Sequence, residues 1–213
     1  MAGAGAGKVA VYTVGRFQPP TIGHKLLIDT VARLASQKGG DAFVFVSYRT
    51  DKPSENPLTP REKINALEEM YGTGIQFVNT ADCKSPCGGP EKAHAFLLSK
   101  GYTDITLVAG SDRAPIFNED APMWKKGKDN GIAPPKFVGL VRTTGAGATA
   151  MSGTEARRRA RSGEYEGFKE AVQVGDITED GIKALYDAIR ARKGGRRTRR
   201  ARRTQKRKTR FVR

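Results

Sequence analysis

Residues 15–24 read GRFQPPTIGH, and this short segment guides the interpretation of the whole chain. Its two adjacent prolines and two glycines make it a poor helix and a poor strand. It separates an apolar run at residues 9–14 from a helical pattern at residues 25–37. Four apolar side chains of that pattern share one helical face: Leu27, Val31, Leu34 and Ala35. The segment is therefore predicted to be the loop between a first strand and a first helix.

The rest of the chain continues this alternation of strands and helices. Continuous apolar runs bounded by turn residues occur at 9–14, 42–47, 75–78, 105–109 and 137–141. Such runs are typical of strands buried on both faces of a parallel sheet, and helical patterns between them imply right-handed crossovers. We therefore predict an α/β fold with a doubly wound, mostly parallel, five-stranded sheet of the Rossmann-like kind, followed by a C-terminal helix.

Helix start signals support these assignments. Thr59-Pro60-Arg61-Glu62 combines an N-cap threonine, a proline at the first position and a glutamate at the third. Residues 152–155 form a second capping box, which opens a helix that Gly163 should close. Another helix is expected at residues 91–100. The last helix should begin near Thr178 and bury Ile182, Leu185, Tyr186 and Ile189.

The net charge of +16 is concentrated at one end of the chain. Residues 190–213 contain 14 Lys and Arg and no acid, whereas the first 189 residues contain 24 basic and 22 acidic residues. A segment this polar cannot bury enough surface to offset its ordering entropy. We predict a flexible leader at 1–7, one domain at 8–193 and a disordered Arg/Lys-rich tail at 194–213. Residues 190–213 should bind polyanions such as DNA, RNA or an anionic surface in a salt-dependent way.

Targeting features and cysteines indicate the compartment. No apolar run reaches the roughly 18 residues of a membrane span, and the first residues do not resemble a signal peptide. These features favour an intracellular, cytoplasmic protein, and the basic tail is also compatible with nuclear or virion association. Cys83 and Cys87 are interpreted as two loop cysteines in a reducing compartment, rather than as a disulfide scaffold or a zinc site.

The loop at residues 15–24 carries groups suited to phosphate. In a doubly wound sheet, ligands bind where loops lead from the carboxyl ends of strands into helix N-termini, whose free N–H groups attract anions. Gly15 permits close approach of the backbone, and Arg16 adds a planar cation. Thr21 supplies a hydroxyl and His24 an imidazole at the helix mouth. On its own, a histidine in this place would more often be a cap or a solvated residue.

A second anion site is expected independently around residues 152–161. Ser152 and Thr154 place hydroxyls at a helix start, and Arg157 lies one turn into that helix, where it can reach back over its mouth. Arg159 and Arg161 are interpreted as members of a solvated face. Two such sites in one chain favour the binding of a polyphosphate.

These two segments resemble the signatures of a known superfamily. GRFQPPTIGH looks like G-x-F-x-P-x-[HT]-x-G-H, the first signature of the nucleotidyltransferases that include cytidylyltransferases and nicotinamide mononucleotide adenylyltransferases. MSGTEAR at 151–157 is similar to the second signature, I-S-x-T-x-x-R. The resemblance covers about residues 8–175. The motifs GRFQP at 15–19 and NPLT at 56–59 most resemble those of archaeal-type nicotinamide mononucleotide adenylyltransferases and of phage and large-virus cytidylyltransferase-like proteins.

The resemblance implies that an acceptor phosphate attacks the α-phosphorus of ATP or CTP and that pyrophosphate leaves. It implies nicotinamide mononucleotide as the leading acceptor, and catalytic roles for His24, Thr21 and Arg157. Residues expected to bind phosphate or nucleotide are Gly15, Arg16, Phe17, Gly23, Ser152, Thr154 and Arg158. Mg²⁺ would be bound mainly by the triphosphate, so no metal site made by the protein itself is expected.

The sequence departs from the superfamily pattern at two positions. Thr21 stands where the H-x-G-H form has its first histidine, so the hydroxyl must do that work. Lys63 replaces the arginine that often follows glutamate in N-P-F-T-x-x-E-R. Together with Asp112 and Arg113, which follow the fourth strand, Lys63 is a candidate contact for nucleotide or acceptor. Asp112 could instead cap the next turn.

A second class of function stays open at this point. The fold could be retained in a non-catalytic, nucleic-acid-associated or virion-associated protein that binds polyanions through its tail. The intact Gly-His and S-x-T-x-x-R features favour the enzyme, because a structural role needs neither of them.

Overall fold

A five-stranded parallel sheet forms the centre of the computed structural model, which describes residues 7–83, 89–141 and 151–192. Its strand order is β3-β2-β1-β4-β5, and every neighbouring pair is parallel. The strands are β1 (Lys8–Gly15), β2 (Asp41–Val46), β3 (Gln76–Asn79), β4 (Tyr102–Gly110) and β5 (Lys136–Leu140). This confirms the predicted doubly wound α/β fold, and the sheet is entirely rather than mostly parallel.

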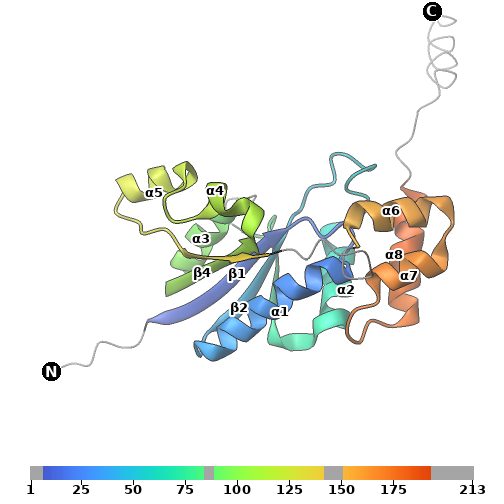
Figure 1. Ribbon diagram of the computed structural model, residues 1–213, viewed down its shortest axis with the longest axis horizontal. Coiled ribbons are helices and arrows are strands. Elements are labelled where there is room, and N and C mark those ends of the chain that lie inside the picture. Colours follow the sequence, from blue (N-terminus) through green and yellow to red (C-terminus); the bar gives the residue numbers. More distant parts are fainter. Residues whose placement is uncertain (1–6, 84–88, 142–150, 193–213) are drawn as a thin grey trace, which may run out of the picture.

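Helices cover both faces of the sheet, as Figure 1 shows. Helices α1 (Ile22–Gln37) and α2 (Pro60–Tyr71) pack on one face, where Val11, Val44 and Val108 are buried. Helix α3 (Pro90–Ser99) packs on the other face, against the side of β1 that carries Tyr12. Successive strand residues point to opposite faces, so both sides of β1 need an apolar cover.

Three further helices gather beside α2 at one end of the molecule (Figure 1). They are α6 (Gly153–Ser162), α7 (Tyr165–Val172) and α8 (Glu179–Ala191). Their apolar faces form a separate core around Phe168, which also takes in Leu58 and Met70. The short elements are η1 (Gly72–Gly74), η2 (Ser111–Arg113), α4 (Ala114–Phe117), η3 (Pro122–Trp124) and α5 (Lys125–Asp129).

The predicted helix boundaries follow from local capping. Thr59 accepts a hydrogen bond from the backbone N–H of Glu62, and the carboxylate of Glu62 accepts one from the N–H of Thr59. Gly163 ends α6 in the left-handed conformation, with φ of 89°. All four apolar residues predicted for the last helix are buried. Helix α7 was not predicted, since its N-cap, Glu164, makes no side-chain capping bond that could mark its start.

Two expectations need correction. Helix α1 begins at Ile22 with Thr21 as N-cap, earlier than the predicted helical pattern, because His24 caps this turn with its side chain. Cys83 is disulfide-bonded, so its interpretation as an unpaired loop cysteine was wrong. A disulfide requires only that two Cα atoms approach within about 7 Å, which a low cysteine count does not exclude.

Several predicted segments lie outside the described residues. These are most of the leader at 1–7, Cys87 and the basic tail at 194–213. In the part of the chain that the structure describes, no helix is both long and apolar enough to cross a bilayer.

Burial of α8 against α6 and α7 should contribute strongly to stability. Leu185 is 3% exposed, so Leu185→Ala should lower the free energy of unfolding by about 2–5 kcal/mol through lost burial and a cavity. Lys183→Ala, at an exposed position of the same helix, is the matched control and should change it by less than about 0.5 kcal/mol. Urea unfolding measures both, and equal effects would contradict the packing of α8.

Candidate active site

The candidate site lies at the carboxyl edge of the sheet. Strand β1 occupies the middle of the sheet, and the loop of residues 16–21 follows it directly. Segment η2, with Asp112 and Arg113, follows the neighbouring strand β4. Because carboxyl ends of parallel strands meet at one edge, the fold brings these predicted site segments to the same side of the sheet.

His24 has a defined orientation at the start of α1. The backbone N–H of Thr21 donates to Nδ1 of His24 over 3.1 Å, and the Thr21 hydroxyl oxygen lies 3.0 Å from the same nitrogen. A neutral imidazole that accepts from the Thr21 N–H carries its proton on Nε2. The ring also packs on Phe17, with the two centroids 5.0 Å apart. Capping and packing together hold the imidazole at the N-terminal end of the helix.

Phe17 is a buried residue that packs against the His24 ring. It is 1% exposed and has a positive φ of 47°, a conformation that non-glycine residues adopt only when their surroundings enforce it. A Cβ at Gly15 would lie 2.6 Å from the Phe17 ring. The absence of a side chain at Gly15 therefore leaves room for the Phe17 ring. The predicted direct contact of Phe17 with nucleotide is not available in this arrangement, because the ring belongs to the core.

Residues of the two sequence signatures touch each other directly. The Thr21 hydroxyl donates to the carbonyl of Met151 over 2.9 Å. A Cβ at Gly23 would lie 2.7 Å from that same carbonyl oxygen, and a Cβ at Gly153 would lie 2.8 Å from the carbonyl oxygen of Gln18. The start of α6 is thus pressed against the loop after β1, at a distance that only glycine allows.

Thr21 is buried between the two signatures. It is 1% exposed, and its single hydroxyl proton is directed at Met151. In this arrangement it joins the two signatures, and the hydroxyl cannot donate to a phosphate at the same time.

Arg157 links α6 to the same loop. Its guanidinium donates to the carbonyl of Gln18 and, over 3.1 Å, to the hydroxyl of Thr154. Ser152 is the N-cap of α6 and accepts from the backbone N–H of Glu155 over 3.2 Å. These contacts place Ser152, Thr154 and Arg157 around one helix mouth, as the sequence predicted.

The predicted capping box of α6 is only half formed. The carboxylate of Glu155 accepts from Arg158 and Arg159 instead of returning to the N-cap, and these bonds lower its pKa to about 2. Arg158 also pairs with Glu164 over 2.9 Å. Its charge is therefore balanced within the protein, in contrast to the phosphate-binding role predicted for it.

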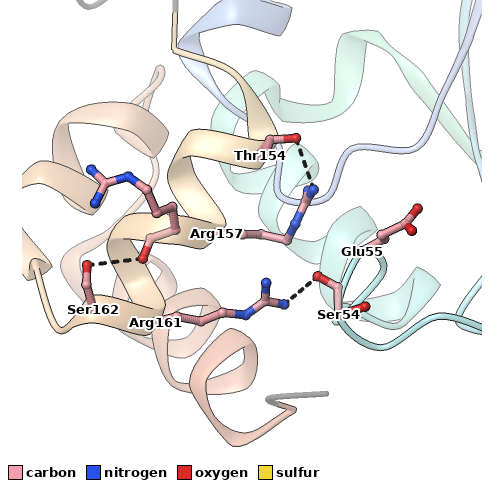
Figure 2. Close-up of a pocket in the computed structure, with 7 residues that line it drawn as sticks. Ser54, Glu55, Thr154, Arg157, Arg161 and Ser162 are labelled. Atoms are coloured by element: carbon pink, nitrogen blue, oxygen red, sulfur yellow. Dashed lines mark hydrogen bonds between the residues drawn. The ribbon is translucent and has the colours of Figure 1, made fainter. Parts of the chain in front are cut away.

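A cavity of about 590 Å³ opens beside Arg157. Figure 2 shows Arg157 and Arg161 extending from α6 toward the loop that carries Ser54 and Glu55. Arg161 donates to the carbonyl of Ser54 over 2.6 Å. The full lining consists of Ser54, Glu55, Thr154, Arg157, Arg158, Arg161 and Ser162. His24 is not part of this lining.

Sequence reasoning missed three of these residues. Arg161 was interpreted as solvated, although it lies one helical turn after Arg157 and so on the same face, which was the available signal. Ser54 and Glu55 come from a loop far away in the sequence, and nothing in their spacing indicates contact with α6.

The charges around the cavity favour an anion. Burial lowers the pKa of Arg157, and the nearby charges of Arg161 and Arg16 lower it further, while Glu55 acts in the opposite direction. Arg16 is 3.9 Å from Glu55 and largely exposed. Three guanidinium groups thus share one carboxylate here, and a bound polyanion would relieve their repulsion.

Lys63 lies inside the protein rather than at the site opening. It is completely buried, and its Nζ donates to the carbonyl of Arg16 over 3.1 Å and to the carbonyl of Ser47. Burial lowers its pKa to about 8. The predicted contact with nucleotide or acceptor is not available to it, because both of its partners are backbone groups of the protein.

Asp112 and Arg113 remain accessible. Both are exposed members of η2, and their charged groups are 3.4 Å apart. The N-cap of η2 is Gly110 and that of α4 is Arg113, so Asp112 is not an N-cap of either. Within the described ranges, no group of three or more His, Cys, Asp or Glu side chains could hold a metal ion.

Fold and site together define a Rossmann-like α/β domain in which the segments at the N-termini of α1 and α6 contact each other. Residues 12–114 match the model of the family described as cytidylyltransferase-like. This part of the chain is thus a cytidylyltransferase-like domain, which fits the nucleotidyltransferase superfamily. No curated protein matches the sequence significantly.

Solved structures share the fold at low sequence identity. A protein named as a nicotinate-nucleotide adenylyltransferase from Vibrio parahaemolyticus superposes with a TM-score of 0.55 at 15% identity, covering 84% of this chain and 98% of its own. The nicotinic acid mononucleotide adenylyltransferase of Plasmodium falciparum, complexed with APC, gives the same four values. TmcAL of Thermotoga maritima, bound with alpha-thio ATP, has a TM-score of 0.53 at 13% identity, covering 86% of this chain and 56% of its own.

The close approach of α6 to the loop after β1 can be tested at Gly153. Alanine normally favours a helix over glycine, yet a Cβ here meets the carbonyl of Gln18 at 2.8 Å. Gly153→Ala should therefore lower the free energy of unfolding by about 1–3 kcal/mol, as overpacking does. Gly74→Ala is the control, because its Cβ would meet nothing within 4 Å. Urea unfolding should separate the two variants, and a stabilised Gly153→Ala protein would contradict the contact.

Lys63 should make stability depend on pH in the alkaline range. Its pKa in the folded protein is about 8, whereas an unfolded lysine titrates near 10.4. Between these values the unfolded chain binds more protons, so rising pH favours folding. Relative to Lys63→Met, the wild type should therefore become more stable from about pH 8 to pH 10 in urea unfolding. Parallel pH profiles of the two proteins would contradict a buried, protonated Lys63.

Proposed function

We propose that the chain transfers a nucleoside monophosphate from ATP or CTP to a phosphorylated small molecule and releases pyrophosphate. The leading acceptor is nicotinamide mononucleotide. The observation that carries this proposal is the direct contact between the loop of residues 15–24 and the start of α6. Two helix N-termini and several cations then serve a single polyphosphate.

The proposed reaction needs no nucleophile from the protein. The acceptor phosphate oxygen attacks the α-phosphorus in line, the bond to the bridging oxygen breaks, and its electron pair leaves with pyrophosphate. Catalysis then consists of positioning two anions and of stabilising charge on the leaving group. The described side chains suit that task, since the site offers guanidinium groups, a neutral imidazole and helix N–H groups.

Each residue has a defined part in this proposal. The Nε2–H of His24 donates to an oxygen of the α- or β-phosphate, because its other ring nitrogen is occupied by Thr21. Arg157 and Arg16 bind the departing pyrophosphate, and Arg157 does so with the donors that its bond to the carbonyl of Gln18 leaves unused. Ser152 and Thr154 hydrogen-bond at the mouth of α6.

Mg²⁺ belongs to the proposal as a partner of the triphosphate. Magnesium usually keeps several waters and is held through substrate phosphates with one or two carboxylates. Glu55, at the cavity, and Asp112, at the same edge of the sheet, are carboxylates that would suit this role. When bound, the ion would supply charge neutralisation on the phosphate oxygens.

The choice of acceptor rests on two supports. One is the sequence motif GRFQP, residues 15–19, in the loop after β1. The other is that the similar structures from Vibrio parahaemolyticus and Plasmodium falciparum are named for nicotinate-nucleotide or nicotinic acid mononucleotide adenylyltransferases. The deciding experiment measures pyrophosphate release with ATP or CTP against nicotinamide mononucleotide, nicotinic acid mononucleotide and a sugar phosphate. Release with none of these pairs would contradict the proposal.

His24→Asn separates the capping role of this residue from its catalytic role. The asparagine oxygen can still accept from the N–H of Thr21, whereas the donor at the Nε2 position is lost. Turnover should fall at least about a hundredfold, as on removal of a preorganised donor, while the melting temperature stays close to that of the wild type. His24→Gln, which keeps a donor near Nε2, should retain more activity. Wild-type turnover in His24→Asn would remove His24 from the mechanism.

A further inference from the structure

Lys63 is the most unusual charge in the described residues. It lies on the first turn of α2, is completely buried, and has backbone carbonyls as its hydrogen-bond partners. No carboxylate lies within ion-pair distance of its Nζ among the described residues. Burying a cation without a counter-ion opposes folding, so a role other than stability is needed to explain it.

The two carbonyls that Lys63 binds belong to the ends of neighbouring strands. Arg16 follows β1, and Ser47 follows β2. The backbone N–H of Ser47 also donates to the carbonyl of Gly15 over 3.0 Å. Lys63 therefore extends the pairing of β1 and β2 beyond the sheet and fixes the direction in which the chain leaves β1.

That direction controls the surroundings of His24. The residue after Arg16 is Phe17, which has a positive φ. In this backbone conformation the Phe17 ring packs against the His24 imidazole, and the two ring centroids are 5.0 Å apart. A shift of the Arg16 carbonyl would turn the peptide that joins Arg16 to Phe17 and displace this ring. The position of His24 thus depends on Lys63 through two residues that lie between them.

A second cation, on helix α6, also binds a backbone carbonyl of this loop. Arg157 of α6 binds the carbonyl of Gln18, as Lys63 of α2 binds the carbonyl of Arg16. A carbonyl oxygen directed at a phosphate would repel it, whereas N–H groups attract it. Because Lys63 and Arg157 donate to these two carbonyls, the carbonyl oxygens are not directed at a bound anion.

We propose that Lys63 is a positioning residue for nucleotidyl transfer, which fixes the loop after β1 so that Phe17 holds the His24 imidazole in its working orientation. This inference rests on the proposed function for its kinetic part only. Its structural part, the coupling of Lys63 to His24, can be measured on the full chain without any substrate.

The test of coupling uses the two histidines of the chain, His24 and His94. In Lys63→Met, whose side chain has a similar length and no donor, the imidazole C–H resonances of His24 should shift, because the Phe17 ring moves relative to them. Those of His94, which packs edge-on to Trp124 at 5.7 Å on the other face of the sheet, should stay in place. His24→Asn assigns the two sets of signals.

Arg61→Met is the matched control. It removes one positive charge from the same turn of α2, at an exposed position, and should leave both histidine signals unchanged. Unchanged His24 signals in Lys63→Met would overturn the proposal. Equal shifts of both histidines would also overturn it, because they would indicate a general structural role.

Kinetics provide the second readout. Lys63→Met should lower kcat by about tenfold to a hundredfold, as misplacement of a catalytic group does, and leave the KM for the nucleotide within about threefold. Lys63→Arg, which keeps charge and donors, should recover part of kcat. Lys63→Leu, which also lacks a donor, replaces Lys63→Met in the spectra if that variant does not fold. An unchanged kcat, or a rise in KM alone, would contradict the positioning role. If the wild type releases no pyrophosphate, the proposed function fails, while the histidine spectra still decide the coupling.

Discussion

The site depends on the backbone contact between the loop after β1 and the start of α6. Gly23 and Gly153 face carbonyl oxygens at distances that exclude any Cβ, and the Thr21 hydroxyl joins the same two segments. Residues that lie about 130 positions apart therefore act as one unit. Because the contact is made by backbone atoms, both helix N-termini lie next to each other, which the proposed binding of one polyphosphate requires.

The arginine side chains of this unit form hydrogen bonds with backbone carbonyl groups. Arg157 binds the carbonyl of Gln18, and Arg161 binds that of Ser54. Carbonyl dipoles and Glu55 therefore partly compensate the charge of these guanidinium groups. A guanidinium with five donors can satisfy a carbonyl and still have donors left for a phosphate. The same residues can thus stabilise the fold and bind substrate.

Much of the fold could be predicted, because its signals are local. Continuous apolar runs identified all five strands, and the sequence around Thr59 located the start of α2 to the residue. The site was predicted less completely. Phe17, Thr21 and Lys63 were assigned to ligand contact by their place in the motifs, yet all three are buried. Their residue types suit phosphate, but burial is set by neighbours that the motif does not contain.

The sequence alone therefore determined the five strands and the helices α1, α2, α3, α6 and α8, and it indicated two segments suited to phosphate, since periodicity and helix caps are properties of short stretches. The tertiary structure alone decided the partner of each polar group. It directed the Thr21 hydroxyl to Met151, paired Arg158 with Glu155 and Glu164, and placed Arg161 on the same cavity as Arg157. A hydrogen bond or ion pair depends on distances of a few ångströms between distant residues, and only the packed chain sets those distances.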